Sequence, residues 1–179
     1  NPVKIDSSEL PVVFDWRVSS SLLGHFAGAI NGQSIAKKTS FLNEMMNKQI
    51  FKKGVNIVDD PLISDGLASK PFDGDGIPTN KIDLVSNGKL NNWILDLASS
   101  RQLNLKTTAH ASRGTSSVPF PSPTNLYLQP GNVSREEIIG DLKKGIYITE
   151  LIGMGVNGVT GDYSRGAAGF LIENGKLTY

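Results

Sequence analysis

The sequence predicts an α+β fold in which antiparallel β-sheet predominates, built like a barrel or a sandwich and carrying two or three helices. The dipeptides Asn87-Gly88 and Asn174-Gly175 each stand between two apolar stretches, which is a strong hairpin signal. Short β-branched and aromatic runs elsewhere lie between glycine- and proline-rich turn signals, and few segments have helical periodicity. Short strands separated by tight turns favour an antiparallel sheet over a parallel sheet with helices on both faces.

The remaining elements follow from the same signals, taken along the chain. The first half is expected to contain a linker at Asn1–Pro11, a strand at Pro11–Phe14, a helix from Ser19–Ser21 to about Ile30, an ambiguous segment at Thr39–Lys48 and a strand at Val55–Val58. The second half is expected to contain a loop at Asp65–Thr79, strands at Ile82–Ser86, Leu90–Leu97 and Leu103–Thr108, a loop at Arg113–Pro123, a strand at Asn125–Leu128, a Ser134-capped helix at Arg135–Lys144 and a hairpin at Phe170–Tyr179.

The first helix is expected to be amphipathic. Its apolar side chains fall on one arc of the helical wheel and should pack onto a sheet. They are Leu22, Leu23, Phe26 and Ile30. Gly24 and Gly28 lie on the opposite side, where they would let another backbone come close. The pair Asn31-Gly32 is expected to end the helix.

Composition bounds the function. The 179 residues suffice for one domain with a real core, and 39% hydrophobic with 20% charged residues fits a globular protein. A net charge of +1 gives no basic field for nucleic acid. The absence of cysteine excludes disulfides and thiolate metal sites. No membrane span or signal peptide is visible, so a cytoplasmic protein is expected. Because the chain starts without methionine and stops in an expected strand, we expect a fragment of a longer protein.

A glycine-rich stretch dominates the C-terminal part of the chain. The strand-like run Ile146–Leu151 is followed by six glycines between residues 153 and 169, interspersed with mixed polar groups, and this glycine density permits positive φ or close backbone approach at several points. Gly153–Gly158 fits G-x-G-x-x-G, but a dinucleotide-binding turn must open a helix, and the later glycines argue against one. We therefore expect Gly153–Arg165 to line the partner- or peptide-facing side of the domain, with backbone groups open to strand addition.

Polar residues near that stretch and on two loops are the candidate peptide- or partner-binding residues. They are Arg113, Asn125, Thr149, Glu150, Asn157, Asp162, Ser164 and Arg165. Arg165 is expected to pair with Asp162 or with a substrate carboxylate. His110 and Arg113 are expected to contact a peptide carboxylate or a partner, although an arginine that satisfies loop carbonyls is an equal alternative.

Metal chemistry has little support in the residues. The chain has two histidines, His25 and His110, so a zinc site would need both and a carboxylate. Their separation has no ligand-spacing signal, which favours structural or surface roles. The loop Asp73–Gly76 resembles the start of a calcium loop, but Ile77 and Pro78 break that pattern, so a solvated turn is expected.

Several longer motifs resemble the C-terminal part of the TldD/PmbA family, specifically its PmbA (TldE) branch. They are Pro11–Phe14, Leu22–His25, Asp59–Pro61, Pro71–Gly76, Ser122–Leu126 and Thr149–Gly169. The resemblance covers nearly all of residues 1–179. It implies a C-terminal domain whose N-terminal α/β neighbour and last residues are missing from this chain. The family is described as a cytosolic metalloprotease system and as a modulator of DNA gyrase.

The resemblance also implies a departure from catalysis. In the TldD branch this helix carries H-E-x-x-x-H, whose positions fall here on Gly24, His25 and Ala29. A cysteine that completes the metal site in that branch has no counterpart. The resemblance thus implies no cofactor in this chain, with zinc held only by a TldD-like partner in a heterodimer that admits unfolded peptides. The alternatives are a stand-alone peptide- or partner-binding homodimer and, last, an active metallopeptidase. Neither nucleic acid nor membrane is expected as a direct partner.

Overall fold

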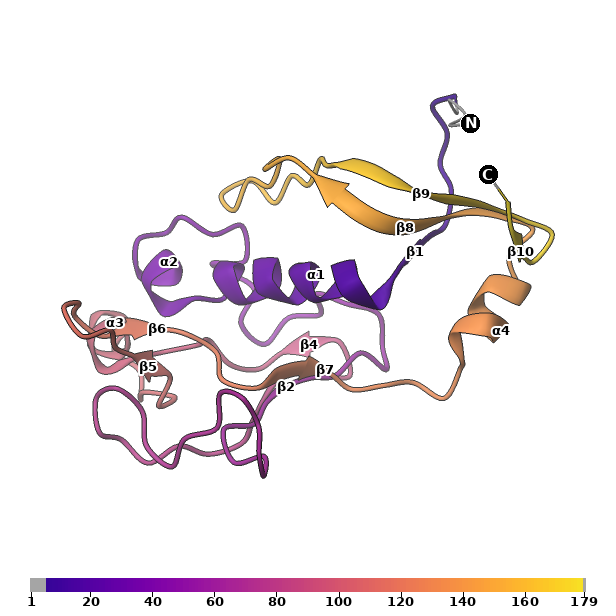
Figure 1. Cartoon of the computed structure of the whole chain (residues 1–179). Coiled ribbons are helices and arrows are strands. Elements are labelled where there is room, and N and C mark those ends of the chain that lie inside the picture. Colours follow the sequence, from indigo (N-terminus) through magenta and orange to yellow (C-terminus); the bar gives the residue numbers. More distant parts are fainter. Residues whose placement is uncertain (1–5, 179) are drawn as a thin grey trace. The chain divides into compact units, whose positions relative to one another are not determined.

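The computed structural model describes residues 6–178 (Figure 1). The chain divides into two compact units. The first five residues of the expected linker and Tyr179 of the expected last hairpin lie outside the described residues. Unit 1 comprises the residues up to Leu22, Pro130–Val156 and the residues from Asp162 onward. Unit 2 comprises Leu23–Gln129 and Asn157–Gly161. The α+β class and the mostly antiparallel pairing are confirmed, while the described part contains four helices and no closed barrel.

Unit 1 is built on a four-stranded sheet in the order β1-β8-β9-β10. Strand β1 (Val12–Phe14) runs parallel to β8 (Lys144–Ile152), and the other pairs with β9 (Gly166–Glu173) and β10 (Lys176–Leu177) are antiparallel. The turn between β9 and β10 has positive φ at Asn174 (49°) and Gly175 (77°), as the sequence predicted.

A short helix, α4 (Arg135–Gly140), covers part of unit 1. Ser134 caps it and exchanges hydrogen bonds with Glu137 in a capping box, which confirms the predicted start. The helix ends at Gly140 rather than at Lys144, because Lys144 already begins β8. Ile139 packs in a small cluster with Tyr147 and Ile172, so unit 1 has a modest apolar core.

Unit 2 contains a second antiparallel sheet in the order β4-β3-β2-β7. Its strands are β2 (Ile57–Asp59), β3 (Ile82–Ser86), β4 (Lys89–Leu90) and β7 (Leu126–Leu128), and a separate ladder joins β5 (Ala111–Ser112) to β6 (Phe120–Pro121). The β3–β4 turn has positive φ at Asn87 (50°) and Gly88 (80°), so the first hairpin is also confirmed. The sheet packs with Phe26, Ile30 and Trp93 in a large apolar core.

Helix α1 (Trp16–Ala29) begins earlier than predicted. Asp15, not a serine, starts it, because its side chain accepts a hydrogen bond from the Arg17 amide at 3.0 Å and its carbonyl accepts from Val18 and Ser19. The expected apolar arc is only partly right, since Phe26 and Ile30 are buried while Leu22 is exposed.

Two short helices, α2 and α3, were not predicted from the sequence. Asn31 does not simply end α1, because its side chain caps α2 (Gly32–Ala36). The predicted strands at Leu90–Leu97 and Leu103–Thr108 are wrong over most of their length: β4 ends at Leu90, an isolated bridge at Ile94 follows, α3 (Leu97–Leu103) comes next, and residues 104–108 form no strand. Asp96 and Ser99 form a buried capping box that starts α3, and Asn104 ends it with φ 54°.

Candidate functional site

The three positions that the resemblance aligns with the H-E-x-x-x-H motif lie on α1, and they do not form a ligand set. Gly24 is exposed, and a Cβ added there would meet nothing within 4 Å. Ala29 is 6% exposed and belongs to the apolar core of unit 2, so it faces away from the side that Gly24 presents. His25 is partly buried between them. Within residues 6–178 no group of three or more His, Asp or Glu side chains is placed to hold a metal ion.

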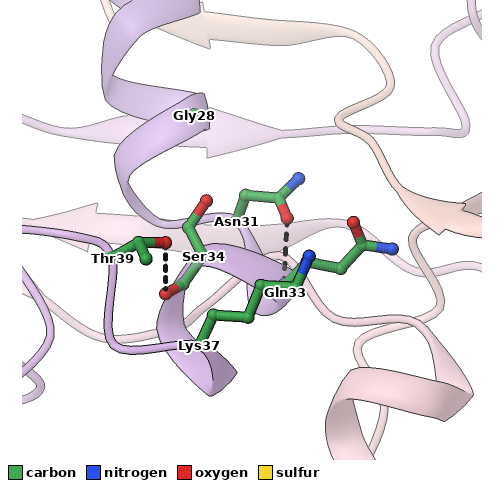
Figure 2. Close-up of a pocket in the computed structure, with 6 residues that line it drawn as sticks. All are labelled: Gly28, Asn31, Gln33, Ser34, Lys37 and Thr39. Carbon is green, nitrogen blue, oxygen red and sulfur yellow. Dashed lines mark hydrogen bonds between the residues drawn. The ribbon is translucent and has the colours of Figure 1, made fainter. Parts of the chain in front are cut away.

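A polar pocket of about 350 Å³ opens where α1 turns into α2. Figure 2 shows its lining residues gathered beside the Gly28 turn of α1, and they are Gly28, Asn31, Gln33, Ser34, Lys37 and Thr39. A Cβ at Gly28 would meet nothing within 4 Å, so this wall is open. The close approach of another backbone that was expected at Gly24 and Gly28 is therefore not made by a described residue.

Hydrogen bonds fix the frame of this pocket. Asn31 accepts from the Gln33 amide at 3.0 Å and donates to the Pro121 carbonyl at 2.8 Å, so its side chain is committed at both ends. The Thr39 hydroxyl donates to the Ser34 carbonyl at 3.3 Å, as the dashed line in Figure 2 marks. The frame therefore leaves the Lys37 ammonium as the charged group of the pocket.

The glycine-rich stretch forms an ordered extension of the β8–β9 hairpin. Ser164 donates its amide to the Gly155 carbonyl at 2.7 Å, and Val156 bridges to Tyr163. A Cβ at Gly155 would overlap the Ser164 carbonyl oxygen, so glycine there permits the close backbone approach. The prediction of close approach is correct for this position.

Three candidate residues in the glycine-rich stretch and its flanking strands form hydrogen bonds between their side chains and backbone groups. Thr149 lies at a bulge in β8 and donates its hydroxyl to the Ala168 carbonyl at 3.3 Å. Arg165 donates from Nε to the Ile152 carbonyl at 3.3 Å. Asn157 accepts from Val159 and Thr160 and so forms the turn at the tip. Glu150, Asp162 and Ser164 are exposed on the same hairpin. Thr149, Glu150, Asp162, Ser164 and Arg165 thus share unit 1, while Asn157 belongs to unit 2.

The two candidate residues on the other loops, Arg113 and Asn125, both belong to unit 2 and differ in their surroundings. Arg113 is exposed at the end of β5. Asn125 is tied into the preceding loop, since its amide nitrogen donates to Asp60 and Ser69 and its oxygen accepts from Ala68. Asn125 therefore holds a loop in place in this structure.

His110 is not available to a surface ligand. It is 1% exposed, and its two ring nitrogens lie 3.1 Å from Asp59 Oδ1 and 2.6 Å from the Thr108 carbonyl oxygen. The Thr108 hydroxyl also lies 3.0 Å from Nδ1, so both ring nitrogens face oxygen atoms of the protein. Asp59 is fully buried and also accepts from the amide and the hydroxyl of Thr124. The structural role foreseen for this histidine is observed, and its expected contact with a peptide is not compatible with this burial.

The loop after Lys70 is also more buried than expected. Asp73 is 4% exposed and accepts hydrogen bonds from Asp75, Ile77 and Ala111. The expectation of a solvated turn is therefore wrong at Asp73. The Asp73 carboxylate can be buried because backbone amides of its own loop and of β5 donate hydrogen bonds to it.

A second polar tie, unforeseen from the sequence, joins β8 to the start of α1 in unit 1. The Tyr147 hydroxyl donates to Asp15 at 2.5 Å, and Arg17 Nε donates to the same carboxylate at 2.7 Å. Hydrogen bonds from Arg17 and then Tyr147 hold the pKa of Asp15 well below its usual range. The same hydrogen bond, followed by burial, raises the pKa of Tyr147. Asp15 and Tyr147 are 132 residues apart, so no local signal pairs them.

Comparisons with known proteins relate the chain to one protein family. The profile of the PmbA/TldA metallopeptidase C-terminal domain matches residues 7–179. The chain is 38% identical over 179 residues to Metalloprotease PmbA of Escherichia coli O157:H7 and 29% identical over 174 residues to a Metalloprotease TldD homolog of Buchnera aphidicola. The chain spans 38% of the length of the first relative and 36% of the second.

Solved structures agree with this placement. A crystal structure of a candidate modulator of DNA gyrase from Bacteroides thetaiotaomicron superposes with a TM-score of 0.88 at 30% identity, covering 98% of this chain and 38% of that one. TldE from Thermococcus kodakarensis superposes with a TM-score of 0.78 at 24% identity, covering 94% of this chain and 39% of that one, and that likeness concerns the fold alone. No helix among the described residues is long and apolar enough to cross a membrane.

Proposed function

Because the chain belongs to the PmbA/TldA metallopeptidase family, we propose that it is part of a PmbA/TldE-type subunit that binds no zinc itself and acts beside a zinc-bearing TldD-like subunit. In this proposal the complex is cytoplasmic and admits unfolded peptides to the zinc site of the partner. The chain's contribution is structural and substrate-guiding.

The residues at the zinc-motif positions carry the proposal. Gly24 and Ala29 have no ligating atom, and a catalytic zinc site needs three protein ligands with one open position. The side-chain directions add a second obstacle, since position 24 points to the exposed side of α1 and position 29 into the core. His25 alone cannot lower the pKa of a bound water. We therefore derive no hydrolytic step from this chain.

The printed names of the relatives support the proposal at a coarser level. A PmbA metalloprotease and a TldD homolog both match this chain, and each name belongs to its own protein. The gyrase-related name of the Bacteroides structure does not imply DNA binding here, because the net charge of +1 provides no basic surface field. The second candidate function is a stand-alone peptide-binding homodimer, which the exposed apolar side chains Ile152, Met154 and Phe170 also allow.

Co-expression with a TldD-like chain tests the proposal. We expect the two full-length chains to co-purify. The pair should cleave an unfolded peptide in a chelator-sensitive reaction, and this protein without the TldD-like chain should not cleave it. A homodimer that ignores the TldD-like chain would favour the second candidate. Cleavage by this protein alone, restored by zinc after chelation, would overturn both.

A further inference from the structure

The pocket between α1 and α2 has the chemistry of an anion site. Lys37 is the sole charged residue among its lining residues, and its ammonium makes no ion pair or hydrogen bond with a described residue. The side chains of Gln33 and Ser34 likewise make no hydrogen bond within residues 6–178. One cation and two neutral groups with N–H or O–H donors thus line one hollow without a partner inside the described chain (Figure 2).

These donors suit a carboxylate. A carboxylate has two oxygens with about four acceptor sites, and an ammonium, an amide and a hydroxyl together can fill them. A single lysine balances one negative charge, whereas a phosphate dianion usually recruits arginine forks or a nest of backbone amides. Charge-assisted hydrogen bonds of this kind are stronger than neutral ones.

The size and shape of the pocket point to one terminal residue. Its volume of about 350 Å³ lies at the lower end of the range for ligand pockets. Because Gly28 has no side chain and a Cβ there would meet nothing within 4 Å, space remains beside the donors for a side chain of the ligand. The frame residues Asn31 and Thr39 are already hydrogen-bonded, so the hollow is preformed.

We propose that this pocket binds the C-terminal carboxylate of a peptide, with Lys37 as the charged anchor, Gln33 and Ser34 as neutral donors, and Gly28 leaving room for the terminal residue. The peptide nature of the ligand rests on the proposed function. The site would hold a chain end within the substrate-guiding subunit, which is a role separate from hydrolysis.

A pair of probes and matched variants tests this site. The protein at its native length is titrated with fluorescein-labelled tetra-alanine that ends in a free carboxylate, and with the same peptide ending in an amide. Because Lys37 is exposed, its contact with the carboxylate is worth up to about 1 kcal/mol, so we expect the acid to bind about three- to fivefold more tightly than the amide. Lys37→Met should abolish this difference, while Lys38→Met, which removes an exposed lysine outside the lining, should keep it.

A second variant separates binding from folding. A Cβ at Gly28 meets nothing within 4 Å and leucine favours a helix over glycine, so Gly28→Leu, which adds a side chain to the pocket wall, should lose the acid peptide while its thermal midpoint does not fall. Gly24→Leu is the control, since position 24 lies one turn earlier on α1, is equally open and does not line the pocket. Equal binding of acid and amide, or normal binding by Gly28→Leu, would overturn the proposal. Stronger competition by inorganic phosphate than by acetate would also overturn it.

Failure of the pocket proposal can be distinguished from failure of the proposed subunit function. If the protein pairs with a TldD-like chain and the pair cleaves peptides, but Lys37→Met binds the acid normally, the pocket proposal alone fails. If acid binding depends on Lys37 but no TldD-like chain pairs, the subunit proposal alone fails.

Discussion

The two units of the molecule are stabilised in different ways. Unit 2 has a core of thirteen buried hydrophobic residues among those described, and it encloses the fully buried Asp59 and the almost fully buried His110. Unit 1 has a buried cluster of three, Ile139, Tyr147 and Ile172, and leaves Ile152 and Met154 61% and 93% exposed.

This difference indicates which interactions each unit depends on. Burial of apolar surface stabilises unit 2, and it also makes each buried polar group there dependent on its partner. Unit 1 depends more on strand pairing, on close backbone approach at glycines and on the Asp15–Tyr147 tie.

The largest effect is expected at the buried hydrogen bonds of Asp59 in unit 2. Asp59→Asn replaces one carboxylate oxygen, which faces His110 or Thr124, with an amide NH2, and each buried donor left without an acceptor costs about 1–3 kcal/mol, so the total loss should exceed about 3 kcal/mol. Asp83→Asn, at an exposed aspartate on the neighbouring strand, is the control and should change the free energy of unfolding by less than about 0.5 kcal/mol. Urea denaturation measures the free energy of unfolding of both variants. Equal losses in Asp59→Asn and Asp83→Asn would contradict a stabilising role for the buried hydrogen bonds of Asp59.

Core truncation should give the next largest contrast. Leu84→Ala in unit 2 removes a fully buried side chain and should cost about 3 kcal/mol, from lost burial and the cavity left behind. Ile152→Ala in unit 1 removes a largely exposed side chain and should cost about 0.5 kcal/mol or less. The contrast between the units would collapse if the two variants unfolded at the same urea concentration.

Two glycines near the β8–β9 connection test the role of close approach. A Cβ at Gly169 would overlap the Tyr147 carbonyl oxygen and lie 2.9 Å from the Ile148 Cα, so Gly169→Ala should cost about 1–3 kcal/mol as the backbone shifts. Gly158→Ala meets nothing within 4 Å and should be nearly neutral. Amide hydrogen exchange of the β8–β9 ladder would show faster exchange in the first variant alone.

How much the sequence revealed depended on how local each signal was. Asn174-Gly175 carries its own turn preference, so that hairpin was predicted correctly. The start of α3 was missed because its N-cap, Asp96, lies inside the run Leu90–Leu97, which was predicted to be a strand. Contacts between distant residues left no local trace, as with His110 and Asp59, which are 51 residues apart.

The candidate site shows the same limit. The sequence placed Gly24 and Gly28 on one side of a helix, but it gave no sign that Lys37, which follows α2, would line the same pocket as Gly28. The glycine stretch was correctly expected to allow close backbone approach, because glycine density is a local property. Its peptide- or partner-facing role stays a prediction.

The smallest expected effect is a pH dependence in unit 1. The pKa of Asp15 is depressed in the folded state by Arg17 and Tyr147, so its stabilisation is fully present above the ordinary aspartate pKa near 3.8 and is lost as the pH falls through the folded value. Tyr147→Phe removes one of these hydrogen bonds and should reduce the difference in urea midpoint between pH 7 and pH 3. An unchanged pH dependence in Tyr147→Phe and in Asp15→Asn would show that this tie contributes nothing.

Zinc content of the purified full-length protein tests the central claim most directly. We expect far less than one zinc per chain after exposure to excess zinc and gel filtration, because Gly24 and Ala29 provide no ligand and His25 is the one ligating side chain at the three motif positions. A His25→Ala variant should then have the same zinc content as the unmodified protein. One tightly held zinc per chain that disappears in His25→Ala would contradict the account.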